Sequence, residues 1–223
     1  MQAEVERALG VVLRRTAVSL AVAGRTDAGV HAWQQVASYD GPPARPASVN
    51  ALLPDDVAVL GCVAAGPGFS ARHDATSRAY CYRILTRATR SAHEHELALH
   101  WPQPLERDLL HACARALIGT HDFTAFTPTE TEHVRFSRDI VSAAWREIAS
   151  DRLEFWIEAD AFLRHMNRVL VGTMLEVAGG ARSLADFEQL LKGRTRSAAG
   201  PTAPPHGLYL AGVGYDGRAV VGS

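Results

Sequence analysis

The first stretch that could do chemistry is the loop at residues 23–32, AGRTDAGVHA, between two apolar runs at 17–22 and 35–39. It holds two glycines, one arginine, one histidine and a single carboxylate, Asp27. Arg25 is two residues away, and a cation so close favours the ionised form of Asp27. A lone carboxylate of this kind suits a nucleophile or a base rather than one half of an acid–base pair. The alternative is a structural turn in which Asp27 makes only a surface salt bridge.

Other well-known catalytic motifs are absent from the sequence. It has no Walker loop, no GxGxxG after a strand, no GxSxG and no HExxH. The run HEHE at 93–96 resembles a metal cluster at first sight. On a strand, however, alternate residues share a face, so only two histidines would lie together, without a third ligand. We therefore expect a solvated connection here and no metal site.

The elements that position the loop follow from the spacing of apolar residues. Helices are predicted at 2–15, 48–53, 105–118, 163–177 and 184–191, the last capped by Ser183, and strands at 17–22, 35–39, 57–63, 80–85, 139–148, 153–159 and 208–215. Hairpins rather than regular βαβ units favour an α+β fold with mostly antiparallel sheet. We expect two lobes, residues 1–100 and 101–223.

Composition limits the class of protein. The chain has 223 residues, 47% hydrophobic and 21% charged, with a formal net charge of −1. No run approaches the roughly 18 apolar residues of a membrane span, and no secretory signal is evident, so we expect a cytoplasmic protein without a membrane partner. Lys192 is the sole lysine among the basic residues. Arginine suits bidentate contacts to phosphate, but binding of nucleic acid would need these side chains gathered on one face. The three cysteines are scattered and suggest neither disulfides nor zinc: Cys62, Cys81 and Cys113.

A resemblance to a known family sharpens this reading. The string GRTDAGVHA at 24–32 resembles the signature of the tRNA pseudouridine synthase A family. Further matches are FSARH at 69–73, SRAYCY at 77–82, HDFTAF at 121–126, AFLRHMNR at 161–168 and GPTAPPHGLYL at 200–210. The matches span nearly the whole chain. The resemblance implies the pseudouridine synthase fold, with helices flanking the sheets of both lobes and an active-site cleft between the lobes.

The same resemblance implies a reaction. Uridine in the anticodon stem-loop of tRNA would be isomerised to pseudouridine without a cofactor. Asp27 takes the place of the catalytic aspartate, which attacks or deprotonates the ribose so that the C–N bond breaks and uracil rotates. Arg168 is the candidate to ion-pair with Asp27 across the cleft, and Arg25 to position the loop or a phosphate.

The resemblance also implies contacts to the substrate. Tyr80 corresponds to the tyrosine that stacks on the target uracil, although a core aromatic on a strand is the alternative. Arg72 and Arg78 are expected to contact RNA, with a structural role open for either. Phe162 is expected in the substrate site as well. The family also implies a homodimer, in which two subunits would pool their arginines into one basic surface.

The sequence departs from the family pattern at two places. The printed chain lacks the opening strand and Tyr-Asp-Gly segment, so we expect a shortened N-terminal lobe. Asn167 stands where the family favours valine. These departures leave two alternatives open: a shortened paralogue that acts on another uridine substrate, and an RNA-binding remnant with impaired catalysis.

Overall fold

Two compact units make up the chain in the computed structural model, which describes residues 1–131, 133–217 and 220. Unit 1 comprises Met1–Arg25 and Val36–Ala75. Unit 2 comprises Thr26–Gln35 and the chain from Thr76 onward. The segment with Asp27 therefore belongs to unit 2, although the chain on either side of it belongs to unit 1.

Unit 1 contains two helices and a small sheet. Its elements are α1 (Gln2–Leu13), β1 (Ala21–Val22), β3 (Ala37–Ser38) and α2 (Pro46–Asn50), and β1 pairs antiparallel with β3. The helix predicted at 2–15 is present, whereas the strands predicted at 17–22 and 35–39 are only two residues long. The apolar side of α1 lies on a small buried cluster of Ala8, Leu9, Leu20, Ala44 and Val49.

The prediction of a strand at 57–63 is wrong. The structure describes all of these residues, and they form no strand. The side chain of Asn50 instead binds both backbone groups of Val59: Nδ2 donates to the carbonyl oxygen at 3.0 Å, and Oδ1 accepts from the amide at 2.7 Å. Leu60 and Val63 are 82% and 86% exposed. The apolar residues in this segment therefore do not pair with any strand of a sheet.

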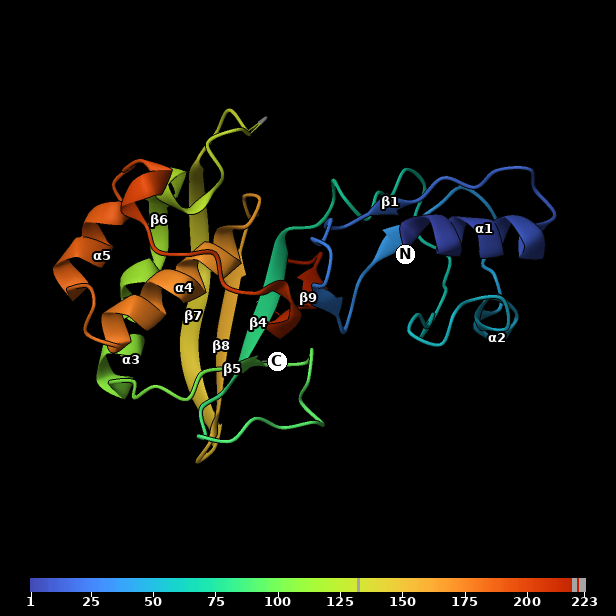
Figure 1. Cartoon of the computed structure of the whole chain (residues 1–223). Helices are drawn as coiled ribbons and strands as arrows, with labels where there is room; N and C mark the ends of the chain where they lie inside the picture. The colour runs from blue at the N-terminus through green and yellow to red at the C-terminus, as the bar shows by residue number, and fades with distance from the viewer. Residues whose placement is uncertain (132, 218–219, 221–223) are drawn as a thin grey trace. The chain divides into compact units, whose positions relative to one another are not determined.

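Unit 2 is organised around one large sheet. In order across it, the strands are β2 (His31–Ala32), β9 (Leu208–Gly214), β4 (Ser77–Leu85), β8 (Arg152–Ala159), β7 (Ser137–Ala149) and β6 (Gly119–Asp122), and β5 (Leu99–His100) also pairs with β4 (Figure 1). The β2–β9 and β4–β5 pairs are parallel, and the other pairs are antiparallel. The prediction of an α+β fold with mostly antiparallel sheet is confirmed.

Three helices cover one face of this sheet: α3 (Arg107–Leu117), α4 (Met166–Ala178) and α5 (Leu184–Leu190) (Figure 1). Short 3-10 turns are η1 (Thr124–Phe126), η2 (Arg196–Ala198) and η3 (Pro205–Gly207). As predicted, Ser183 caps α5, since its hydroxyl accepts a hydrogen bond from the Asp186 amide at 3.0 Å. Burial alternates along the first part of β7, whereas β4 and α4 are buried along nearly their whole length. The largest fully buried side chains of unit 2 include Tyr82, Phe123, Phe126, Phe155 and Phe187.

The compact units divide the chain differently from the boundary expected near residue 100. β4 pairs with β8 from Arg78 to Leu85, so a strand expected in the first lobe lies at the centre of the sheet of unit 2. In the described residues, no helix has both the length and the apolar character that a membrane crossing requires.

Candidate active site

The turn that carries Asp27 is fixed by its own backbone and by η3. The Val30 amide donates to the Asp27 carbonyl oxygen at 3.1 Å. Gly29 has φ +80°, in the left-handed region that glycine adopts without strain, and a Cβ there would lie 3.0 Å from a side-chain carbon of Pro205. β2 begins directly after this turn, with His31 opposite Tyr209 of β9. The carboxylate of Asp27 is thereby held beside segments from the far end of the sequence.

Arg168 brings α4 to the same carboxylate. Its Nη1 lies 2.9 Å from Asp27 Oδ2, and the side chains of Arg168 and Asp27 are 14% and 29% exposed. The Arg168 Nε donates to the Ala203 carbonyl oxygen at 2.8 Å, and the Ala203 amide donates back to the Arg168 carbonyl oxygen at 3.0 Å. The guanidinium is thus held by the Ala203 carbonyl oxygen and by Asp27, and its orientation is fixed. The ion pair expected between Arg168 and Asp27 is present, within unit 2.

A close approach of two backbones supports this arrangement. Gly172 of α4 lies against the carbonyl group of Pro201, so closely that a Cβ at this position would overlap the carbonyl oxygen. At the next residue of α4, the Thr173 hydroxyl accepts a hydrogen bond from the Gly200 amide at 3.0 Å. These contacts hold the segment that includes Ala203 against α4. They therefore also hold the oxygen that anchors Arg168.

Tyr80 lies on β4 with its ring packed against Phe162. The two ring centroids are 5.0 Å apart, edge to face at 81°. Tyr80 is only 8% exposed, and burial raises the pKa of its hydroxyl to about 12. Arg78 lowers this pKa and the negative charge of Asp27 raises it, so both groups lie within electrostatic reach of the phenol. The geometry agrees with both readings of Tyr80, as a core aromatic and as one wall of a site.

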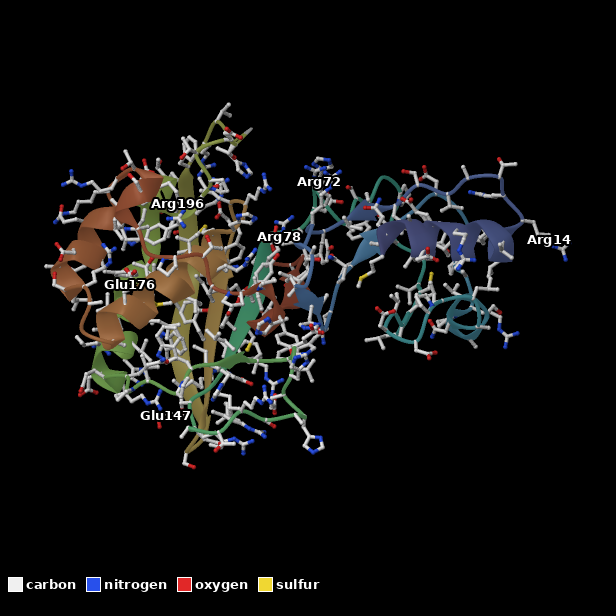
Figure 2. The ribbon with its side chains drawn as sticks, viewed as in Figure 1. Arg14, Arg72, Arg78, Glu147, Glu176 and Arg196 are labelled. Atoms are coloured by element: carbon white, nitrogen blue, oxygen red, sulfur yellow. The ribbon has the colours of Figure 1, made fainter. Side chains whose placement is uncertain are left out.

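The remaining predicted site residues fall into two groups. Arg78, labelled on β4 in Figure 2, is half-buried and donates from Nη1 to the Asp160 carbonyl oxygen at 3.0 Å. Phe162 is also half-buried, and both residues belong to unit 2 with Asp27, Arg168 and Tyr80. Arg25 and Arg72 belong to unit 1, where both are exposed; Figure 2 labels Arg72. Their expected roles stay predictions.

His165 is a neighbour of Asp27 that the motif reading passed over. Its Nε2 lies 3.5 Å from Asp27 Oδ2, and its side chain is 26% exposed. Burial lowers its pKa below the ordinary 6.5, and three arginines lower it further while Asp27 raises it. One signal was available in the sequence: in the helix predicted at 163–177, His165 and Arg168 are three residues apart, and residues at that spacing share a face.

Within the HEHE run, Glu94 joins two arginines in ion pairs, and its side chain is only 12% exposed. Glu94 lies 3.4 Å from Arg83 and 3.2 Å from Arg152, measured from carboxylate oxygen to guanidinium nitrogen. The residues that the structure describes include no group of three or more His, Cys, Asp or Glu side chains placed to hold a metal ion.

Comparisons with known proteins agree on one family. A family model described as tRNA pseudouridine synthase matches residues 113–216. The chain is 38% identical to the tRNA pseudouridine synthase A of Bacillus pumilus, over 97% of this chain and 90% of that protein. It is 39% identical to the enzyme of that name from Bacillus subtilis, with the same coverage. With the one from Chromobacterium violaceum the identity is 41%, over 96% of this chain and 84% of that protein.

Proposed function

The chain belongs to the tRNA pseudouridine synthase A family, and we propose that it isomerises uridine to pseudouridine in tRNA with Asp27 as the nucleophile or base. The observation that carries the proposal is the Asp27–Arg168 ion pair at 2.9 Å, with Tyr80 in electrostatic reach of the same carboxylate. These groups come from the β1–β2 connection, from α4 and from β4.

The isomerisation exchanges one glycosidic bond for another. The bond between N1 of uracil and C1′ of ribose breaks, the base turns, and C5 bonds to C1′. The hydrogen on C5 leaves as a proton and N1 gains one, so the composition of the RNA is unchanged. Asp27 would attack the ribose or remove a proton from it, and both steps need an anionic oxygen held in one direction. Arg168 supplies that direction, because Ala203 fixes its guanidinium.

Tyr80 and Phe162 would receive the base. A uridine that changes its glycosidic bond must leave the helical stack, and aromatic side chains offer it an alternative surface. Arg78, a half-buried residue, would bind phosphate or ribose nearby. Arg25 and Arg72 remain proposed contacts of the anticodon arm.

Assembly and location are further parts of the proposal. We propose a cytoplasmic homodimer that acts without a cofactor and in which arginines of both subunits face one tRNA. Such pooling would reconcile phosphate binding with a net charge of −1 per chain. Affinity for tRNA would then fall steeply as salt rises. A flat salt response would contradict the phosphate contacts.

Replacement of Asp27 tests the central claim. Asp27→Asn keeps the shape of the side chain and removes its charge, and Asp27→Ala removes the group. Both variants should lose isomerisation, measured as release of tritium from tRNA labelled at C5 of uridine. Binding of the tRNA should survive, because phosphate contacts supply most of the affinity. Asp56→Asn, an exposed aspartate of unit 1, is the matched control and should retain activity. Tritium release by either Asp27 variant at the wild-type rate would refute the assignment.

A further inference from the structure

We infer that His165 is a positioning residue for Asp27: with Arg168 it holds Oδ2 of the carboxylate and leaves Oδ1 as the oxygen that meets the ribose. This inference rests on the proposed role of Asp27. It assigns different tasks to the two oxygens of one carboxylate.

Convergence on a single oxygen is the first observation. Arg168 Nη1 and His165 Nε2 lie 2.9 Å and 3.5 Å from the same atom, Asp27 Oδ2. In the described part of the chain, no hydrogen bond reaches Oδ1. The His165 contact is longer than a good hydrogen bond. Such contacts at active sites often tighten only when the substrate is present.

The backbone of His165 is the second observation. It has φ 62° and ψ −2°, a left-handed conformation immediately before α4. Glycine adopts this conformation with less strain, so the backbone alone gives no reason for a histidine here. The strained turn does place the imidazole on the side of α4 that also carries Arg168. An unfavourable conformation that directs a side chain at a reactive group is typical of functional sites.

The charges around His165 define its protonation. The facing groups are Asp27, which raises the pKa of the imidazole, and Arg164, Arg168 and Arg196, which lower it; Figure 2 labels Arg196. Burial lowers this pKa most of all, and the result lies below 6.5. These effects together favour the uncharged imidazole over the imidazolium. In the tautomer with hydrogen on Nε2, it presents a donor to Oδ2 without adding a second cation beside the carboxylate.

Substitution of His165 by glycine distinguishes the effect of losing the imidazole from an effect on the stability of the fold. His165→Gly removes the side chain and relieves the positive φ, so its melting temperature should equal or exceed that of the wild type. We expect kcat to fall about 10- to 100-fold, because a carboxylate held only by Arg168 is less well aimed. KM for tRNA should change less than about twofold, since the imidazole adds nothing to phosphate binding. Glu96→Gly relieves another positive φ, 58°, and is the matched control with wild-type kcat.

Substitution by glutamine tests the donor and its titration. The amide of His165→Gln can occupy the place of Nε2 and donate to Oδ2, so this variant should recover most of the kcat that the glycine variant loses. In the wild type, kcat should fall on the acid side as His165 takes up a proton, because a second cation beside Oδ2 draws charge from Oδ1. The glutamine variant has no such group, so its acid limb should move to lower pH. A purely structural histidine would leave the limb in place.

The outcomes separate this inference from the proposed function. If Asp27→Asn is inactive while His165→Gly keeps wild-type kcat at every pH, the role of His165 is refuted and that of Asp27 stands. An unchanged acid limb in His165→Gln also refutes it. If Asp27→Asn remains active, the proposed function fails, and the inference that depends on it fails too. Loss of kcat in the glycine variant, recovery in the glutamine variant and a shifted limb support both.

Discussion

In unit 1, two strands of two residues each and two helices share a cluster of five buried side chains. In unit 2, a sheet with strands of up to 13 residues lies under three helices, and the core extends from α5 to β9. A two-stranded sheet is marginal alone, whereas a many-stranded sheet with a covered face is stable. The Asp27 segment is continuous in sequence with unit 1 on both sides, yet its described side-chain contacts come from unit 2. The better-packed region therefore determines where the carboxylate lies.

A matched pair of leucines tests the difference in packing, and it carries the largest expected effect. Leu170→Ala removes a side chain of α4 that is 0% exposed, and Leu9→Ala removes one of α1 that is 5% exposed. Measured Leu→Ala costs range from about 2.7 to 5 kcal/mol and depend on how far the site can collapse. We expect Leu170→Ala near the upper end and Leu9→Ala near or below the lower end. Denaturant unfolding of both variants measures this difference. Equal costs would show that the smaller cluster is as rigid as the larger.

The second-largest effect is expected from the substitution of two helix glycines, one in each unit. Gly172→Ala in α4 would push its new methyl group into the Pro201 carbonyl, and we expect a loss of about 1–3 kcal/mol in the free energy of unfolding. Activity should fall further, because displacement of this segment moves the Ala203 oxygen that anchors Arg168.

The control for this prediction is Gly10→Ala in α1. A Cβ there meets only the Arg15 carbonyl oxygen at 3.2 Å, and alanine favours helix by about 1 kcal/mol, so the change in stability should be small. Thermal unfolding together with tritium release measures both effects. A Gly172→Ala enzyme of normal stability and activity would contradict the role given to the close approach.

The smallest expected effect is a gain in the free energy of unfolding. Asn167 is 5% exposed, and its Oδ1 has no hydrogen-bond partner within the described chain. Asn167→Val should raise the free energy of unfolding by about 1 kcal/mol, since an unsatisfied buried polar atom is removed. Asn50→Val in unit 1 is the contrasting variant: it loses both bonds to Val59 and should be destabilised. A lower melting temperature for Asn167→Val would reveal a partner for the amide.

Local patterns predicted the parts of the fold that local physics determines. The cap at Ser183, the hairpin of β7 and β8 and the periodicity of α3 and α4 all follow from neighbours in sequence. The prediction of a strand at 57–63 was wrong because an alternating pattern forms a strand only beside a partner strand. Here the Asn50 side chain, not a strand, binds the backbone of Val59. The division into units depends on pairing between β4 and β8, which lie far apart in the sequence and leave no local signal.

The candidate site shows the same limit. Motif resemblance brought Asp27 and Arg168 together across 141 positions, and the structure places them 2.9 Å apart. The motifs could not predict the second contact of Arg168. Its acceptor, the Ala203 carbonyl, is a backbone group, and every residue type has one. The motifs also passed over His165, whose contact with Asp27 depends on a left-handed backbone that sequence patterns do not indicate for histidine.

The parallel pairing of β2 with β9 has a consequence for synthesis on the ribosome. Asp27 precedes the Ala203 carbonyl that holds Arg168, and also β9, by more than 170 positions, so it leaves the ribosome well before them. Until those residues emerge, the carboxylate has neither its strand nor its fixed guanidinium. During synthesis, the contacts that hold Asp27 therefore form only after β9 and the Ala203 segment have been made.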